Sequence, residues 1–173
     1  MKIYLMRHGV AREPAGAGFE ADRQRPLTAE GRDSITRIAH ALKKLDVEPD
    51  LILSSPYLRA EQTATILAKE FDLQKHLILS ELLAPEGKAE EIIGMIVEKY
   101  LVDELVIVGH EPCLGLLASL LAASDFDLVI NLKKGGKWDL KIGIKKAKLE
   151  DSASFLFPDV LNTPLHKGKY SAD

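Results

Sequence analysis

The sequence predicts an α/β protein: a three-layer α/β/α sandwich with helices on both faces of a mostly parallel central sheet. Short apolar runs alternate with segments of helical spacing from residue 3 to about residue 123, which indicates repeated strand–helix units. The apolar runs contain few polar residues, as expected for strands covered on both faces. A length of 173 residues, with 46% hydrophobic and 28% charged residues, suits one compact domain.

The first 123 residues predict four strands and four helices in alternation. Residues 10–27 predict a loop, because prolines and glycines stand there among charged residues. Thr28 is a suitable N-cap for the helix that follows, in which Ile35 and Ile38 fall on one face. The strands are expected at 3–6, 51–53, 77–79 and 105–108, and the helices at about 29–45, after Ser54-Ser55-Pro56, after Gly87 and at 113–123.

The pattern changes after residue 126. Short strand-like runs follow at 126–132, 138–144 and 153–157, some of them expected to be antiparallel. The last sixteen residues have no periodicity. We therefore expect a single domain over residues 1–157 and a mobile C-terminal tail over 158–173.

Composition excludes several classes of protein. A net charge of −3 does not favour binding to nucleic acid or to an acidic membrane surface. No apolar run is long enough to cross a bilayer, and no signal peptide is apparent. Cys113 is the only cysteine, so no intrachain disulfide forms, which fits a reducing compartment. We expect a cytoplasmic protein with no nucleic-acid or membrane partner.

Unusual polar residues follow three of the predicted strands. Arg7 and His8 follow the first, Arg59 lies shortly after the second, and His110 follows the fourth. Because ligands bind at the carboxyl ends of parallel strands, these side chains are expected to converge. Arginine forks bind phosphate oxygens, a neutral imidazole can attack phosphorus, and a second imidazole can hydrogen-bond the transferring group. We expect a backbone acceptor to hold one ring nitrogen of His8, so that the other presents its lone pair. No carboxylate cluster suggests a metal site.

Four sequence blocks carry a resemblance to a known family. They are MRHG at 6–9, RPLTAEG at 25–31, SSPYLRAEQTA at 54–64 and VGHEP at 108–112. Together, in this order, they resemble the histidine phosphatase superfamily, which has the phosphoglycerate mutase-like fold, and in particular its SixA-type branch. The resemblance covers residues 1 to about 124, and the chain after about residue 145 matches the family poorly.

The resemblance implies a metal-independent phosphatase without a cofactor. It implies that His8 accepts the phosphoryl group, that Arg7 and Arg59 bind phosphate, that His110 stabilises the transferring phosphoryl group and that Arg25 is a further phosphate ligand. The expected substrate is a protein phosphohistidine, that is, a phosphoramidate, or a phosphomonoester such as a small phosphorylated metabolite.

The general acid is less clear from the sequence. Larger members of the family use a carboxylic acid after the third strand, where Glu81 is the nearest match. Glu86 and Asp22 are alternatives, and the other interpretation of Glu81 is as a partner for an active-site arginine. Two other functions stay open: a phosphoglycerate mutase-like transferase or broad small-molecule phosphatase, and a catalytically idle module that recognises phosphate.

Overall fold

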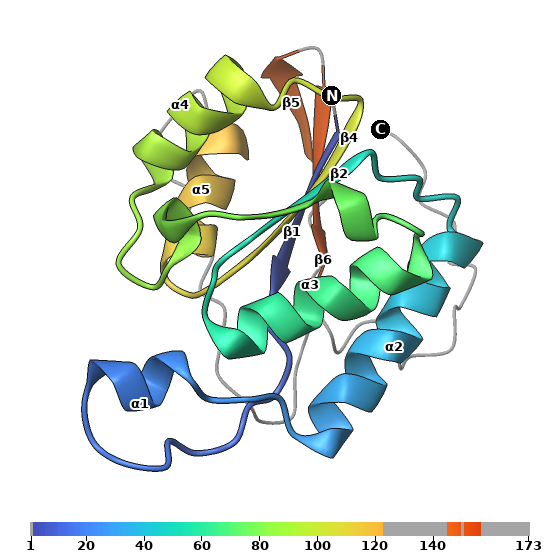
Figure 1. Cartoon of the computed structure of the whole chain (residues 1–173). Coiled ribbons are helices and arrows are strands. Elements are labelled where there is room, and N and C mark those ends of the chain that lie inside the picture. The colour runs from blue at the N-terminus through green and yellow to red at the C-terminus, as the bar shows by residue number, and fades with distance from the viewer. Residues whose placement is uncertain (1, 123–144, 150, 157–173) are drawn as a thin grey trace.

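A computed structural model describes residues 2–122, 145–149 and 151–156. Within these residues a six-stranded sheet has the strand order β3-β2-β4-β1-β6-β5 (Figure 1). Neighbouring strands are parallel, except that β5 runs antiparallel to β6. The strands are β1 (Lys2–Arg7), β2 (Leu51–Ser54), β3 (Leu77–Leu79), β4 (Glu104–Gly109), β5 (Lys145–Leu149) and β6 (Asp151–Leu156).

Helices cover both faces of the sheet, which confirms the predicted three-layer α/β/α sandwich (Figure 1). One face carries α2 and α3, and the other carries α4 and α5. The short helix α1 lies apart from these layers, beyond the end of β1. The helices are α1 (Phe19–Arg23), α2 (Ala29–Lys44), α3 (Leu58–Glu70), α4 (Ala89–Lys99) and α5 (Cys113–Ala122), with 3₁₀ turns at Gln74–His76 and Glu81–Leu83.

The alternation of side chains along β1 divides the core into two parts. Ile3 and Leu5 pack with α4 and α5, whereas Tyr4 and Met6 pack with α2 and α3. Successive side chains of a strand point to opposite faces, so a strand between two helical layers needs apolar residues at every position. Each such side chain contributes roughly 1.5–3 kcal/mol when fully buried.

Strand register brings three strand ends to one edge of the sheet. Arg7 at the end of β1 lies opposite Gly109 at the end of β4. Ser54 at the end of β2 lies opposite Val108 of β4. The chain segments that follow β1, β2 and β4 therefore start side by side.

The segment between β1 and α2 is fixed by a cap and a close backbone contact. The Thr28 side chain accepts a hydrogen bond from Gly31 N over 2.9 Å, which confirms the predicted N-cap. Gly31 packs directly on the backbone of Val10, because a Cβ at Gly31 would lie only 2.2 Å from the Val10 carbonyl oxygen. Helix α2 is thus held against the residues that follow His8.

Two elements differ from the sequence prediction. The loop expected over residues 10–27 contains α1, a five-residue helix too short to show a helical period. A strand, β5, forms over Lys145–Leu149, where no strand was expected. Its three lysines hide the apolar pattern, and lysine is common on edge strands such as this one. The run predicted at 153–157 corresponds to β6, whereas the runs at 126–132 and 138–144 and the tail at 158–173 lie outside the described residues.

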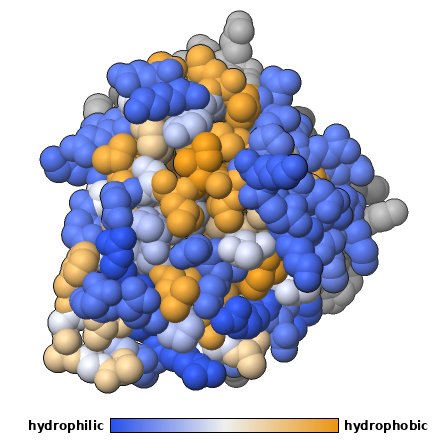
Figure 2. Space-filling view, in the orientation of Figure 1, coloured by the Kyte–Doolittle hydropathy of each residue, from blue (hydrophilic) through white to orange (hydrophobic). Residues whose placement is uncertain are grey.

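Figure 2 shows apolar residues gathered in the middle of the face that Figure 1 presents, with hydrophilic residues around them. The described helices include none with the length and apolar character needed to cross a membrane.

Candidate active site

His8 follows directly after β1, and one of its two ring nitrogens carries a lone pair. Its Nδ1 lies 2.8 Å from the carbonyl oxygen of Gly9. A carbonyl oxygen only accepts hydrogen bonds, so Nδ1 carries the proton and Nε2 the lone pair, as expected from the sequence. Burial lowers the pKa of His8 to about 4, and three neighbouring arginines act in the same direction. His8 is therefore neutral and able to act as a nucleophile near pH 7.

His110 follows β4 and lies beside His8, with 5.0 Å between the ring centroids. The pairing of β1 with β4 places them together, and His8 N donates to the carbonyl oxygen of Gly109 over 3.2 Å. Nε2 of His110 lies 2.8 Å from Oγ of Ser55, which follows β2. Burial holds the pKa of His110 well below its usual range, with the neighbouring His8 and Arg59 adding to the effect. Both imidazoles are thus neutral.

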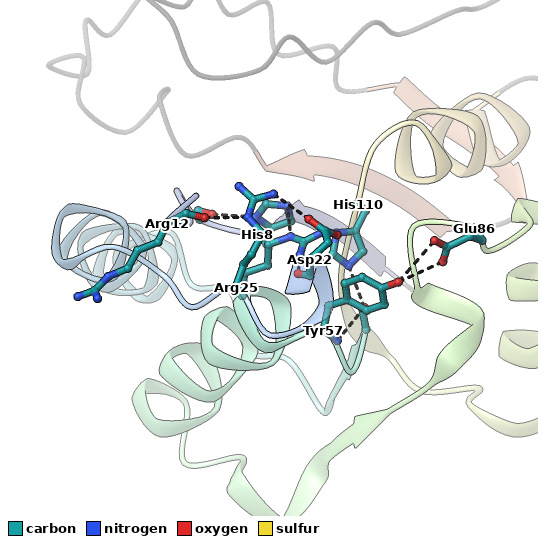
Figure 3. A network of polar contacts seen from close by, with 10 residues as sticks. His8, Arg12, Asp22, Arg25, Tyr57, Glu86 and His110 are labelled. Atoms are coloured by element: carbon teal, nitrogen blue, oxygen red, sulfur yellow. Dashed lines mark hydrogen bonds and ion pairs between the residues drawn. The ribbon is translucent and has the colours of Figure 1, made fainter. Parts of the chain in front are cut away.

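Two arginines converge on the carboxylate of Asp22 (Figure 3). Arg59, in the first turn of α3, is 5% exposed and donates from Nε to Nε2 of His8 over 3.2 Å. Its Nη2 donates to Oδ2 of Asp22 over 3.0 Å, and its Nη1 donates to the Asp22 carbonyl oxygen over 2.7 Å. Arg25 donates from Nη1 to Oδ1 of Asp22 over 2.9 Å and from Nε to the Arg12 carbonyl oxygen over 2.7 Å.

The charge state of Asp22 follows from these contacts. Partial burial acts to raise the pKa of Asp22, but hydrogen bonds and charges from Arg25 and Arg59 outweigh that effect and lower the pKa. Asp22 is therefore ionised, which makes it a poor proton donor in this arrangement.

Arg7 and Glu111 influence each other electrostatically at the same edge. Burial lowers the pKa of Arg7, and the negative charge of Glu111 opposes this effect. Burial raises the pKa of Glu111 to about 7, despite Arg7 and a hydrogen bond from the backbone of Gly115. Oε1 of Glu111 is buried and has no hydrogen-bond partner among the described residues. Glu111 is thus a carboxyl group that titrates near neutral pH beside a predicted phosphate ligand.

Glu81 lies in the 3₁₀ turn after β3 and pairs with Arg23 of α1. Nη2 of Arg23 donates to Oε1 of Glu81 over 2.5 Å, and Nη1 donates to Oε2 over 3.3 Å. The Glu81 side chain is 66% exposed. The structure therefore places Glu81 at the rim of the site, as the partner of an arginine.

The ring of Tyr57 contacts two arginines and a histidine of the site. Its ring lies 5.0 Å from the Arg59 guanidinium carbon, 5.4 Å from that of Arg23 and 5.2 Å from the centroid of His110. Its hydroxyl lies 3.5 Å from both carboxylate oxygens of Glu86, as Figure 3 shows. Tyr57 is 1% exposed, so its ring fixes the position of the side chains stacked on it.

The structure thus brings together most of the residues predicted from the sequence. His8 contacts both Arg59 and His110, and Arg25 joins them through Asp22. The sequence analysis did not assign roles to Tyr57, Ser55, Glu111 or Arg23. Ser55 and Tyr57 lie in the same block as Arg59, and Glu111 is next to His110, so their position in the sequence was the available signal.

In the part of the chain that the structure describes, no group of three or more histidine, cysteine, aspartate or glutamate side chains is placed to hold a metal ion.

Comparison with known proteins gives a consistent result. The family model described as "Histidine phosphatase superfamily (branch 1)" matches residues 3–84. An uncharacterized protein of Picosynechococcus sp. is 35% identical over 159 residues, which cover 90% of this chain and 94% of the relative. Phosphohistidine phosphatase SixA of Escherichia coli K12 is 32% identical over 132 residues, which cover 72% of this chain and 76% of the relative.

A solved structure is also similar. The structure of the protein histidine phosphatase SixA complexed with tungstate superposes with a TM-score of 0.63 at 28% identity, covering 75% of this chain and 81% of that one.

Proposed function

Because the chain belongs to the histidine phosphatase superfamily, in its SixA-type branch, we propose that it hydrolyses its substrate through a phosphoryl group carried covalently on His8. Membership of this family supports a phosphatase. The observation that carries the proposal is the state of His8: Nδ1 bonded to the Gly9 carbonyl, Nε2 bearing the lone pair, and a pKa of about 4. A neutral imidazole held in this way is a nucleophile that needs no separate base.

The reaction proceeds in two steps. Nε2 of His8 attacks phosphorus in line while the bond from phosphorus to the leaving atom breaks. The leaving atom takes the electron pair and a proton, which comes from solvent for an imidazole and from an acid for an alkoxide. Water then attacks phosphorus and loses a proton to solvent. The bond from phosphorus to Nε2 breaks with its electron pair returning to His8, and inorganic phosphate leaves. The same imidazole is thus both attacking and leaving group.

The fixed positive charges of the arginines stabilise the transition state of phosphoryl transfer. We propose that Arg7, Arg25 and Arg59 bind the equatorial oxygens and that His110 donates a hydrogen bond to the transferring group. Positioning and electrostatic stabilisation supply most of the catalysis in phosphoryl transfer. Since these side chains fill every binding role, we propose that the reaction needs no metal ion or other cofactor.

We propose a protein phosphohistidine as the substrate, with a small phosphorylated metabolite as the alternative. Two observations support this choice: one relative is named a phosphohistidine phosphatase, and Glu81 is largely exposed and engaged by Arg23. Imidazole leaving from phosphorus needs little help from an acid, whereas an alkoxide needs a well-placed proton donor.

The proposal is tested first by trapping the intermediate. Rapid denaturation during turnover should yield a phosphoenzyme that is stable in alkali and labile in acid, and His8→Ala should abolish both the adduct and the activity. His76→Ala is the matched control, because His76 is exposed on a 3₁₀ turn and should leave both unchanged. Appreciable turnover by His8→Ala would overturn the mechanism.

A substrate panel then separates the candidate activities. The kcat/KM values for a phosphohistidine protein, a phosphoserine peptide, a sugar phosphate and a phosphoglycerate should be highest for the phosphohistidine protein, with a chelator present throughout. Transfer of the phosphoryl group between phosphoglycerates would favour a mutase-like transferase instead. Any turnover at all would dismiss an idle phosphate-recognition module.

A further inference from the structure

Two of the three arginines proposed to bind phosphate, Arg25 and Arg59, are already bound to an anion of the protein itself. Asp22 accepts from Arg25 through Oδ1 and from Arg59 through Oδ2, and its backbone carbonyl accepts a third hydrogen bond from Arg59. A carboxylate that bridges two guanidinium groups occupies the same kind of position as a phosphate bridging two arginines. Asp22 therefore competes for the groups that the substrate needs.

The same arrangement covers the nucleophile. Arg59 directs Nε at Nε2 of His8 over 3.2 Å. Nδ1 of His8 is committed to Gly9, so Nε2 is the nitrogen that must reach phosphorus. The guanidinium group of Arg59 is held in this position by its two hydrogen bonds to Asp22, one from each Nη atom. The lone pair of His8 stays covered while Asp22 holds Arg59.

The element that carries Asp22 is suited to release it. Helix α1 has five residues, none of them buried, and it begins after Gly18, whose φ of 102° favours glycine. Asp22 itself is 40% exposed, whereas Arg59 is nearly buried. Moving the carboxylate away therefore opens no part of the hydrophobic core, and only polar and stacking contacts at the surface have to change.

We propose that Asp22 is an internal anion that holds Arg25 and Arg59 and covers His8 until the phosphate of the substrate displaces it. Asp22 is thus a positioning residue that acts through the arginines, and this inference rests on the proposed phosphate site. A phosphate dianion brought to the arginines lies beside the carboxylate, and the two negative charges repel each other. A dianion displaces the singly charged carboxylate from the arginines more effectively than a monoanion does. The site therefore favours phosphomonoesters and phosphoramidates over phosphodiesters, which are monoanions.

Asp22→Asn tests the proposal, since the amide keeps the size and one acceptor of the side chain but removes its charge. The variant should bind orthophosphate about tenfold more tightly, because the competing closed state no longer reduces the competent fraction. Calorimetric titration measures this affinity without turnover. In steady-state assays with an aryl phosphate, KM should fall while kcat stays within about threefold of the wild type.

Two further variants serve as controls. Glu20→Gln removes a negative charge from the same helix and keeps an acceptor for Gln24, so phosphate affinity should change less than about twofold if the effect is not one of general charge. Asp22→Glu keeps the charge and should bind phosphate about as the wild type does. The melting temperatures of all variants establish that they fold.

Weaker phosphate binding by Asp22→Asn would mean that Asp22 only supports the arginines, and an unchanged affinity would mean that it does not compete; either result overturns the proposal. A wild-type protein that binds phosphate but hydrolyses no substrate would refute the proposed function and leave the inference on Asp22 intact.

Discussion

At the scale of single residues, Glu81 tests whether the site supplies a proton to the leaving group. Its carboxylate pairs with Arg23 at the rim of the site. Because Glu81 is largely exposed and engaged by Arg23, we expect Glu81→Gln to change hydrolysis of both a phosphohistidine protein and an alkyl phosphate by less than about threefold. A selective loss of roughly a hundredfold on the alkyl phosphate would mean instead that Glu81 protonates the leaving alkoxide. The measurement is kcat/KM on one substrate of each class, at one pH and ionic strength.

Glu86→Gln is the matched comparison, because Glu86 lies beside the Tyr57 hydroxyl, whereas Arg23, the partner of Glu81, lies over the Tyr57 ring. If Glu86 donates the proton, Glu86→Gln shows the selective loss of kcat/KM on alkyl phosphates. A large and uniform loss on every substrate with Glu81→Gln would show that Glu81 holds Arg23 in place and donates no proton.

The sequence was informative about individual site residues where they follow strands. His8, Arg59 and His110 are adjacent in space because parallel strand ends meet at one edge of the sheet, and this rule applies before any coordinates are known. Asp22 was foreseen only as an alternative acid. Its bridge to Arg25 and Arg59 depends on how the segment between β1 and α2 folds back, and no local pattern encodes that path.

At the scale of elements, two glycines in helices should respond oppositely to alanine. Gly31→Ala places a methyl group 2.2 Å from the Val10 carbonyl oxygen, so α2 must move away from the residues after His8. We expect a loss of about 1–3 kcal/mol in the free energy of unfolding. A methyl group at Gly94 of α4 would meet no other part of the described residues within 4 Å beyond its own helix backbone and chain neighbours, so Gly94→Ala should gain about 0.5–1 kcal/mol from helix propensity.

Chemical denaturation of both variants measures these differences. Activity gives a second readout, since Gly31→Ala should also reduce kcat/KM by shifting the segment that carries His8, whereas Gly94→Ala should not. Stabilisation by Gly31→Ala would contradict the close packing of α2 on the backbone of Val10.

Elements with a strong period were predictable, and elements shaped by contacts were not. The amphipathic helix expected at about 29–45 matches α2, and the apolar run at 77–79 matches β3. Helix α1 has no apolar face of its own; it is held by Phe19 and Arg23 against the ring of Tyr57, almost forty residues later in the chain. Contacts between residues so far apart in the chain cannot be predicted from a local sequence pattern.

At the scale of the whole molecule, stability should depend on pH through His8 and His110. Both His8 and His110 have a lowered pKa in the folded protein, whereas unfolded histidine titrates near 6.5. Below pH 6.5 the unfolded chain binds protons that the folded protein does not, so the free energy of unfolding falls as the pH falls. His8 alone should cost about 3 kcal/mol by pH 4, and above pH 6.5 this dependence should disappear.

Denaturation curves at several pH values check this expectation. His8→Asn should flatten the slope between pH 4 and 6.5, and the exposed His76→Asn should not. Glu111 acts in the opposite direction, because its folded pKa of about 7 lies above the unfolded value; stability from this group is lost as the pH rises from 4.5 to 7. Glu111→Gln should therefore make the dependence on the histidines steeper.

The central place of β1 in the sheet has a consequence for synthesis of the chain. Lys2 pairs with Glu104 and Ile3 with Ala153, so both neighbours of the first strand are made more than a hundred residues after it. At roughly 5–20 residues per second, an apolar first strand waits for several seconds without its partners while translation continues. The ribosome thus releases His8 well before β4, whose Gly109 carbonyl accepts the hydrogen bond from His8 N. A nascent chain that stalls before residue 104 therefore exposes an apolar strand without its partners and has no assembled site.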